Sequence, residues 1–406
     1  MKNKIIRKAK NDKGITLIAL VITIIVLLIL AGITLSIVLG PNGIIQRAKQ
    51  AKTETEQAAL NEQSILNGVD SFINEQLSGN GSSTGGEEGK KLPEATENTK
   101  PYLPDDNYIV IEDNPEKGLV VKDTETGNEY VWVEVPRSIY TTASNETDYT
   151  NIEKDMQTYA ADYREANHAD TYQADIGFTN ETDYNNAKNK MLRSVYTYGG
   201  FWIGRYEMGT ETIRKEGASA TTTPLIQRDK YVYNYVTISQ AKTLADSLSK
   251  ENTYTSSLMY GIQWDLTMKY IQTRGGKILN ELKTDSTNWG NYKNVEFTLT
   301  RVEAKYSVDK GQTYTDNTTG DYSKSIDQSI LFTTGASERN CALNIYDLAG
   351  NVYEWTLEKT SLASYPASQR GGYYNANSGS TPAGVRSYSK VTEGKEWNGF
   401  RSSLYK

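Results

Sequence analysis

Histidine and cysteine, which supply many catalytic and metal-binding groups, are almost absent from this chain of 406 residues. The one cysteine, Cys341, excludes an intramolecular disulfide. The one histidine, His168, excludes a metal site built from several histidines. Nucleophilic catalysis would need a Ser or Cys paired with a histidine base, and the sequence offers no such arrangement. Carboxylates could act alone, but no spacing of acidic residues points to that chemistry.

An excess of positive charge is also lacking. The chain has 44 Lys and Arg against 50 Asp and Glu, a net charge of -6 at pH 7. This balance predicts no nucleic-acid partner. Tyrosine is abundant, with 29 residues against 6 phenylalanines. Surfaces rich in Tyr, Asn, Ser and Thr are typical of recognition sites, although they also suit the surface of a secreted protein.

Charge is missing altogether from one long stretch, Ile15 to Leu39. At about 1.5 Å per helical residue it exceeds the roughly 30 Å hydrocarbon core of a bilayer. Residues 15–40 are therefore predicted to form a transmembrane helix. The short segment before it is basic, which predicts a cytoplasmic N-terminus and an extracellular remainder. The basic residues are Lys2, Lys4, Arg7, Lys8, Lys10 and Lys13.

The start of this apolar run reads Lys-Gly-Ile-Thr-Leu-Ile around Gly14 and Ile15, and it resembles the leader of type IV prepilins. The resemblance implies that residues 1–14 are a leader, that prepilin peptidase cuts after Gly14, and that Ile15 becomes the methylated N-terminus. Most pilins have Glu at the fifth mature position, where this chain has Ala19. That difference leaves open whether the protein joins other pilin subunits in a surface filament. An uncleaved single-span anchor is the alternative, since the run is too long for a secretory signal peptide.

Composition divides the rest of the chain. Residues 41–77 carry apolar residues at spacings of three and four, which predicts an amphipathic stalk helix. Residues 78–104 begin with a Gly- and Ser-rich run and are predicted to be a flexible linker. Residues 105–406 are expected to form one head domain. Within it, residues 138–198 are poor in aliphatic side chains and are expected to be a solvated insertion with some helix.

Strand and helix patterns both occur in the head, which predicts an α+β fold. Strands are expected at 109–111 and 201–207, and helices at 236–248, with Ser239 as the N-cap, and at 263–273. A β-hairpin is expected from 118–122 to 130–135, with its turn at Gly127-Asn128.

Four strings in the head occur in a fixed order. They are Phe-Trp-Ile-Gly-Arg-Tyr-Glu at 201–207, Tyr-Asp-Leu-Ala-Gly-Asn-Val-Tyr-Glu-Trp at 346–355, Arg-Gly-Gly at 370–372 and Gly-Phe-Arg at 399–401. Together they resemble the formylglycine-generating enzyme, or sulfatase-modifying factor, family over roughly residues 118–406. The resemblance implies a C-type-lectin-like α+β fold with much irregular structure.

The same resemblance argues against catalysis. The family's oxygen-activating enzymes bind copper through two cysteines just after the Arg-Gly-Gly motif, and thiolates are the ligands soft enough for Cu(I). A match without gaps puts those positions on Ala376 and Thr381. The related iron-dependent sulfoxide synthases need several histidines. We therefore expect neither copper nor iron, and no enzyme activity.

Calcium is a different case. Asp347, Gly350, Val352 and Glu354 match positions that bind calcium in the family, two through side chains and two through backbone carbonyls. Oxygen ligands of this kind suit calcium. The resemblance thus implies a structural calcium ion. The alternative is that Asp347 caps a turn and Glu354 forms an ion pair.

The segment from 371 to 399 is rich in Tyr, Asn and Ser and has few aliphatic residues to bury. On the family's fold the equivalent loops form the active-site face. Residues of this kind suit a binding face, although an ordinary solvated terminal region is the alternative. The expected ligand-binding residues are Tyr373, Tyr374, Asn375, Asn377, Arg386 and Trp397.

These expectations describe a type IV pilin-like, single-pass membrane protein. It would display a non-catalytic head for adhesion to, or recognition of, an extracellular protein or glycan. A membrane-tethered enzyme of the sulfatase-modifying class and a purely structural minor pilin or pseudopilin are the alternatives. Oxygen consumption with retained copper would favour the enzyme, and filament incorporation without ligand binding would favour the structural role.

Overall fold

The computed structural model describes residue 25, residues 89–114 and residues 117–406. The chain divides into two compact units, Met1–Gly86 and Glu87–Lys406, and the second is the head. The predicted leader, transmembrane helix, stalk and first part of the linker lie outside the described residues, apart from Ile25. Within the described residues, no helix is both long and apolar enough to cross a bilayer.

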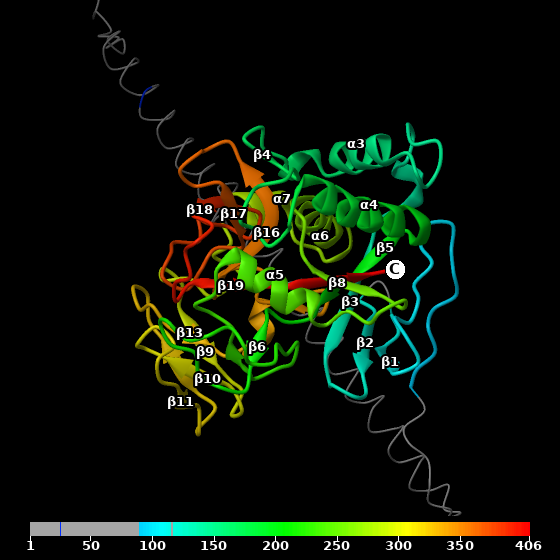
Figure 1. Ribbon diagram of the computed structural model, residues 1–406. Coiled ribbons are helices and arrows are strands. Elements are labelled where there is room, and N and C mark those ends of the chain that lie inside the picture. The colour runs from blue at the N-terminus through cyan, green and yellow to red at the C-terminus, as the bar shows by residue number, and fades with distance from the viewer. Residues whose placement is uncertain (1–24, 26–88, 115–116) are drawn as a thin grey trace, which may run out of the picture. The chain divides into compact units, whose positions relative to one another are not determined.

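Short strands and helices alternate along the head (Figure 1). The helical elements are η1 Arg137–Ile139, α3 Tyr149–Tyr159, η2 Ala161–Tyr163, α4 Glu181–Tyr198, α5 Ile238–Asp246, α6 Gly261–Arg274, α7 Leu279–Lys283 and η3 Glu338–Asn340. The strands up to residue 307 are β1 Tyr108–Glu112, β2 Val120–Asp123, β3 Glu129–Glu134, β4 His168–Ala169, β5 Gly200–Gly204, β6 Gly209–Thr210, β7 Tyr231–Val232, β8 Thr255–Leu258, β9 Phe297–Leu299 and β10 Lys305–Ser307. The later strands are β11 Thr315–Asp316, β12 Tyr322–Lys324, β13 Leu331–Phe332, β14 Cys341–Ala342, β15 Ile345–Tyr346, β16 Tyr353–Thr360, β17 Ala367–Arg370, β18 Arg386–Ser389, β19 Asn398–Phe400 and β20 Ser402–Tyr405.

A six-stranded sheet, in the order β1-β2-β3-β5-β20-β8, joins the two ends of the head. Its first three strands form an antiparallel meander that confirms the predicted hairpin, with Gly127 at a positive φ of 76° in the turn. The last strand, β20, pairs with both β5 and β8, and its Leu404 and Tyr405 are fully buried. The C-terminal segment, red in Figure 1, therefore runs through the middle of the head.

The second large sheet has the order β18-β17-β16-β19, and β4 also pairs with β16. Strand β19 runs parallel to β16. From β19 the chain passes through a single residue, Arg401, into β20 of the first sheet. Arg401 thus lies at the junction of the two sheets.

Three helices cover the sheets around one core. Helix α4 contacts β5 and β20, α5 contacts β8 and β16, and α6 contacts β3 and β16. Trp132, Trp202, Trp264 and Trp355 are fully buried in this core, and aromatic residues of this size contribute much of its buried area. Helix α5 begins after Thr237, whose side chain accepts a hydrogen bond from the backbone N–H of Gln240. The cap is thus Thr237, and the expected cap Ser239 lies inside the helix.

Part of the predicted linker packs on the head. The indole Nε1 of Trp132 donates to Thr99 Oγ1 at 2.8 Å, and the buried ring of Tyr102 lies 5.5 Å from that of Trp132. Lys90 forms an isolated β-bridge with Val110. Residues 90–104 therefore belong to the head, because aromatic and threonine side chains supply buried contacts where aliphatic residues are few.

The segment 138–198 also differs from the solvated insertion that we expected. Helices α3 and α4 contact each other, and Ile152, Met156, Tyr184 and Leu192 are fully buried in the main core. Tyrosine and methionine bury large apolar areas, so a low aliphatic content did not indicate exposure here.

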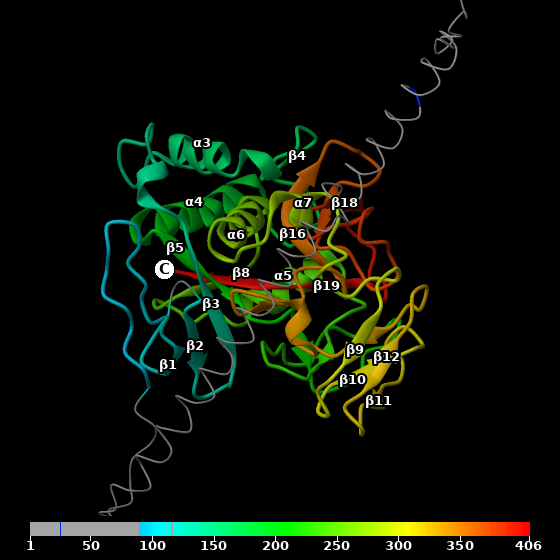
Figure 2. The same ribbon diagram turned by 180° about the vertical axis from the view of Figure 1, so that it is seen from behind.

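Residues 297–336 form a lobe with a small core of its own. Strands β9 and β12 pair, and β11, β10 and β13 form a three-stranded sheet. Phe297, Leu299, Ile330 and Phe332 are buried between them. Both ribbon views show this lobe, in yellow, on the opposite side of the head from α3 and α4 (Figures 1 and 2). This part of the chain thus folds into short strands.

Candidate binding face and buried ionic clusters

A tight turn between β15 and β16 holds the positions that were expected to bind calcium. The backbone φ is positive at Asp347 (61°), Gly350 (77°) and Asn351 (59°). A Cβ atom on Gly350 would lie 2.1 Å from the carbonyl oxygen of Asn291, so only glycine fits. This close approach allows the backbone N–H of Asn351 to donate to that carbonyl at 3.0 Å.

The two acids of this turn are buried and have protein partners. Asp347 accepts hydrogen bonds from the backbone N–H of Gly335 at 2.6 Å and from Asn340 Nδ2 at 3.3 Å. Glu354 accepts from Arg401 Nη2 at 2.6 Å and from Arg401 Nε at 3.0 Å. Arg401 thereby connects the end of β19 to β16.

Glu207 is a third buried acid beside Asp347 and Glu354, although the sequence of residues 201–207 predicted only a strand. Its Oε1 accepts a hydrogen bond from Asn351 Nδ2, and its Oε2 has no partner among the described residues. Burial first, and then the charges of Asp347 and Glu354, raise the pKa of Glu207 well above its ordinary value. Burial also raises the pKa of Asp347 and of Glu354. We call Glu207, Asp347, Glu354 and Arg401 the Glu354–Arg401 cluster.

As folded, this donor set does not fit the calcium ion that the resemblance implies. The oxygen chemistry is suitable. However, all four carboxylate oxygens of Asp347 and Glu354 accept hydrogen bonds from protein groups. In the described part of the chain, no group of three or more His, Cys, Asp or Glu side chains is spaced to hold a metal ion. The arrangement corresponds to the ion pair that the sequence left as the alternative.

A second buried ionic cluster lies where β16, β17 and β18 meet α6. Arg370 donates to Asp265 at 2.8 Å and to Glu358 at 3.3 Å, and Arg386 Nε donates to Glu358 at 2.7 Å. Arg386 Nη2 also contacts Asp265, and all four side chains are fully buried. Burial alone would raise the pKa of Glu358, but Arg386 and Arg370 hold it at about 2. We call these four residues the Asp265–Arg370 cluster.

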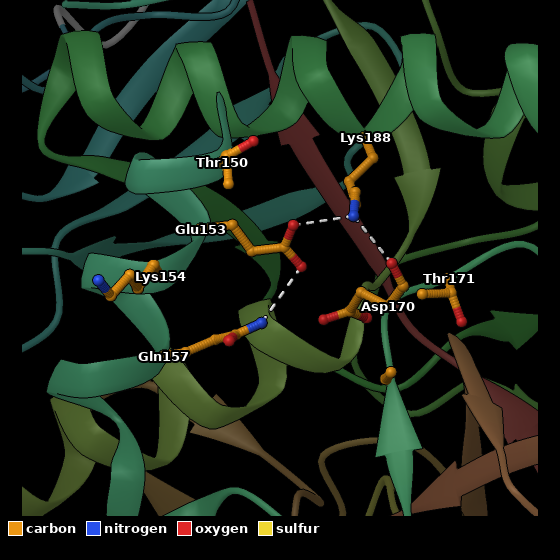
Figure 3. Close-up of a pocket in the computed structure, with 8 residues that line it drawn as sticks. Thr150, Glu153, Lys154, Gln157, Asp170, Thr171 and Lys188 are labelled. Carbon is orange, nitrogen blue, oxygen red and sulfur yellow. Dashed lines mark hydrogen bonds and ion pairs between the residues drawn. The ribbon is translucent and has the colours of Figure 1, made fainter. Parts of the chain in front are cut away.

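A recess of about 350 Å³ opens beside this cluster, between α3, residues 169–171 and α4 (Figure 3). Lys188 Nζ donates to Glu153 Oε2 and to the carbonyl oxygen of Asp170, both at 2.9 Å. The Asp170 carboxylate accepts from the backbone N–H groups of Gly261 and Ile262 at the start of α6. These polar groups thus form hydrogen bonds with one another, and the bonds hold α3 and α4 against the core.

The structure separates the expected ligand-binding residues into two groups. Tyr374 is buried in a small apolar cluster with Val232, Leu331 and Val352, and Arg386 is buried in the Asp265–Arg370 cluster. Both are therefore held inside the protein, because their contacts are with the core and not with solvent.

The other four expected residues lie at the surface. Tyr373 and Trp397 are half-buried, with ring centroids 5.6 Å apart, and Tyr353 lies 4.9 Å from Tyr373. The side chains of Asn375 and Asn377 are exposed. We call Tyr373, Asn375, Asn377 and Trp397 the aromatic face.

The loop that carries this face is held in place by Ser378. The buried Ser378 Oγ donates to Asp285 Oδ1 at 2.7 Å, and its backbone N–H donates to Asn294 Oδ1 at 2.9 Å. The positions that correspond to the family's copper cysteines, Ala376 and Thr381, are half-buried on either side of it. The loop thus retains a defined conformation without the thiols.

The single cysteine and histidine lie away from this loop. Burial raises the pKa of the Cys341 thiol to about 12, so the thiolate that would bind copper does not form near neutral pH. Burial lowers the pKa of His168, and among the described residues neither ring nitrogen has a hydrogen-bond partner, although Nδ1 lies 3.9 Å from Glu165 Oε2. His168 pairs with Thr360 where β4 meets β16.

This geometry defines a class: a mixed α+β head with two sheets joined at Arg401 and a loop face formed by its C-terminal quarter. The chain belongs to the family of the Sulfatase-modifying factor enzyme 1-like domain, whose sequence pattern matches residues 173–404. Strands β1 to β3 and helix α3 lie outside the matched residues. Among curated proteins, none matches this chain significantly.

Two solved structures show a distant likeness. PvdO from Pseudomonas aeruginosa is 14% identical, with 52% of this chain and 82% of that chain covered and a TM-score of 0.30. Treponema denticola variable protein 1 is also 14% identical, with 51% of this chain and 85% of that chain covered and a TM-score of 0.29.

Proposed function

We propose that this protein is a type IV pilin-like membrane protein that displays a non-catalytic head for binding an extracellular protein or glycan. The aromatic face is the binding site. Residues 15–40 anchor the chain after prepilin peptidase has removed residues 1–14. The head then lies outside the cell, and the Glu354–Arg401 cluster has a structural role.

The observation that carries this proposal is the aromatic face itself. The rings of Tyr373 and Trp397 are half-buried and lie 5.6 Å apart at an angle of 43°, while Asn375 and Asn377, on the same loop as Tyr373, are exposed. Rigid aromatic rings offer a large contact area with little loss of side-chain entropy, and amides add directional hydrogen bonds. The anchoring of the loop by Ser378 lowers the cost of ordering this surface on binding.

The test replaces both rings, as Tyr373→Ala with Trp397→Ala, in the full-length protein purified in detergent. Glycan arrays and panels of extracellular proteins are probed with the parent and the variant. We expect the strongest signals of the parent to fall by about 30-fold or more, which corresponds to about 2 kcal/mol for a central aromatic pair.

The matched control is a second aromatic pair. Tyr365 and Tyr388 also have ring centroids 5.6 Å apart and are exposed, but they lie on β18 and the β16–β17 connection. Tyr365→Ala with Tyr388→Ala should leave binding unchanged. Equal losses in both double variants would contradict the assignment, and copper-dependent oxygen consumption with a cysteine-containing sulfatase peptide would support the tethered-enzyme alternative instead.

Processing is tested separately. N-terminal sequencing of membrane-extracted protein should begin at a methylated Ile15. A Gly14→Leu variant should retain residue 1 or 2 at its N-terminus, because the peptidase would lack its glycine. An intact N-terminus in the parent protein would support the uncleaved anchor and contradict the prepilin interpretation.

A further inference from the structure

Lys324, at the end of β12, is a buried cation without an acidic partner. The residue is 1% exposed. In the described part of the chain, its Nζ has no carboxylate within ion-pairing distance and donates only to backbone carbonyls. These are the carbonyls of Tyr292 at 2.5 Å, Val295 at 2.6 Å and Lys293 at 3.5 Å. Burial, with the charge of Arg339 as a second cause, lowers the pKa of Lys324 to about 8.

Three carbonyl oxygens that converge on one point form the kind of cage that a metal cation occupies in proteins. A lysine ammonium is a compact charge with three N–H donors, so it can satisfy the same three oxygens. The cage lies on residues 292–295, which precede β9, whereas Lys324 comes from the paired strand β12. The ammonium therefore holds the base of the lobe to the rest of the head.

Arg401 occupies an equivalent position at the turn where the resemblance implies calcium. Besides its two contacts with Glu354, it donates to the carbonyl oxygen of Gly204 at 2.8 Å and to that of Tyr346 at 2.7 Å. Its ligands are thus carboxylate and carbonyl oxygens, the donor types of a calcium site. Its side chain is fully buried.

The two sites are physically connected. Asn291 precedes the carbonyl cage, and its backbone N–H donates to the carbonyl oxygen of Ala349 at 3.1 Å. Its side-chain Nδ2 donates to Asn351 Oδ1 at 3.0 Å, inside the turn of the Glu354–Arg401 cluster. Each site therefore helps to position the backbone of the other.

We propose that the head uses Lys324 and Arg401 as built-in cations in place of structural metal ions. Lys324 fills a carbonyl cage at residues 292–295, and Arg401 neutralises the turn at residues 347–354. It follows that the folded head does not depend on metal. It also follows that removing the Lys324 side chain converts the cage into a site for a small external cation.

The first arm of the test uses the unmodified full-length protein. The melting temperature of the head should be the same in millimolar calcium and in excess EDTA, because both oxygen sites already hold a positive charge. A fall of several degrees on chelation, reversed by calcium, would overturn the proposal and would support a structural calcium ion. This arm needs no variant, so it decides even if the variants fail to fold.

The second arm removes the ammonium. Lys324→Ala should lower the melting temperature by several degrees, and added n-propylammonium should restore part of the loss because it reproduces the missing atoms. The neutral analogue n-propanol should not. Lys305→Ala, on strand β10 of the same lobe with a surface ion pair to Asp316, is the control and should respond to neither compound. Equal rescue by both compounds would show that volume matters and not charge, and would contradict the proposal.

The third arm addresses Arg401. Arg401→Gln leaves the three acids of its cluster without a cation, so millimolar calcium should raise the melting temperature of this variant and not that of the parent. Binding of calcium alone is measured in parallel by isothermal titration. No calcium effect on Arg401→Gln, with a folded protein by circular dichroism, would contradict the role assigned to Arg401.

Discussion

The two buried ionic clusters of the head differ in how their charges are balanced. The Asp265–Arg370 cluster has two carboxylates and two guanidinium groups, and every carboxylate oxygen faces an arginine nitrogen. A third arginine, Arg164, lies 2.8 Å from Asp265 Oδ2 at the edge of this cluster. The Glu354–Arg401 cluster has three carboxylates, Glu207, Asp347 and Glu354, and one guanidinium group. Burial disfavours the charged carboxylates in both clusters, but only the first has at least as many guanidinium groups as carboxylates.

The balance decides the direction of the pKa shifts. Glu358, in the balanced cluster, has its pKa lowered to about 2. It therefore contributes stability above its ordinary value of 4.5, and that contribution is lost as the pH falls from about 4.5 toward 2. Glu207, in the unbalanced cluster, has its pKa raised. Its contribution is present below pH 4.5 and is lost as the pH rises through its folded pKa. The same kind of residue thus acts with opposite sign in the two regions.

Breaking the balanced cluster should have the largest effect. Arg370→Met removes the guanidinium between Asp265 and Glu358 and leaves these two buried carboxylates with Arg386 and with Arg164, which lies 2.8 Å from Asp265 at the edge of the cluster. We expect a loss of about 3–5 kcal/mol in the free energy of unfolding, measured by urea denaturation at pH 7. Arg193→Met, whose ion pair with Glu146 is exposed, is the control and should cost less than about 1 kcal/mol. Similar losses in both variants would show that burial of the pair is not the cause.

The turn of the unbalanced cluster should be the next most sensitive. Gly350→Ala adds a Cβ atom that meets Asn291 O at 2.1 Å, at a φ of 77°. We expect a loss of about 2–3 kcal/mol, from backbone strain and from displacement of Asn291.

Gly276→Ala separates these two causes. Gly276 also has a positive φ, of 68°, but an added Cβ would meet nothing within 4 Å. This variant should cost about 1 kcal/mol from strain alone. If thermal denaturation gave the same loss for Gly276→Ala as for Gly350→Ala, the close approach of the two turns would have no energetic role.

The smallest expected effect is on the pH dependence of stability, which differs between the two clusters. Glu207→Gln keeps a side-chain oxygen that can accept the hydrogen bond from Asn351. It removes the carboxyl group, whose negative charge is disfavoured by burial. The variant should gain stability relative to the parent as the pH rises from 5 to 8, by about 1 kcal/mol or more, the scale of the cost of an unsatisfied buried polar group.

The measurement is the melting temperature of both proteins across this pH range. Glu211→Gln, at an exposed ion pair with Lys230, provides the control and should follow the parent at every pH. Parallel curves for Glu207→Gln and the parent would mean that Glu207 does not titrate differently in the folded head.

Local sequence patterns predicted many elements of the head correctly. Alternation of apolar residues located the strands β1 to β3 and β5, and three- and four-residue spacing located α5 and α6. Predictions failed where side chains other than aliphatic ones form the core. Thr99 and Tyr102 in the supposed linker, and Tyr184 in the supposed insertion, are buried through aromatic and hydrogen-bonded contacts.

The exposure of the expected ligand-binding residues was predicted in part. Tyr373, Asn375, Asn377 and Trp397 lie at the surface of the head, whereas Arg386 and Tyr374 do not. Amino-acid composition does not distinguish the exposed residues from the buried ones. An arginine in a polar segment gives the same sequence pattern whether its side chain faces solvent or a buried acid. The sequence did not indicate the buried contacts of Glu207 and Lys324, because the residues that they contact come from distant parts of the chain.

Four short strings are enough to indicate the family, because their glycines and aromatic residues meet local backbone and packing requirements. The sequence also determined that several-histidine and two-cysteine sites are impossible. Which charges face one another depends on the fold, because Arg401 and Glu354 are 47 residues apart and Arg370 and Asp265 are 105 residues apart in the sequence. Whether a buried acid meets an arginine, a backbone N–H or another acid depends on how the two sheets join, and that determines the sign of its contribution to stability.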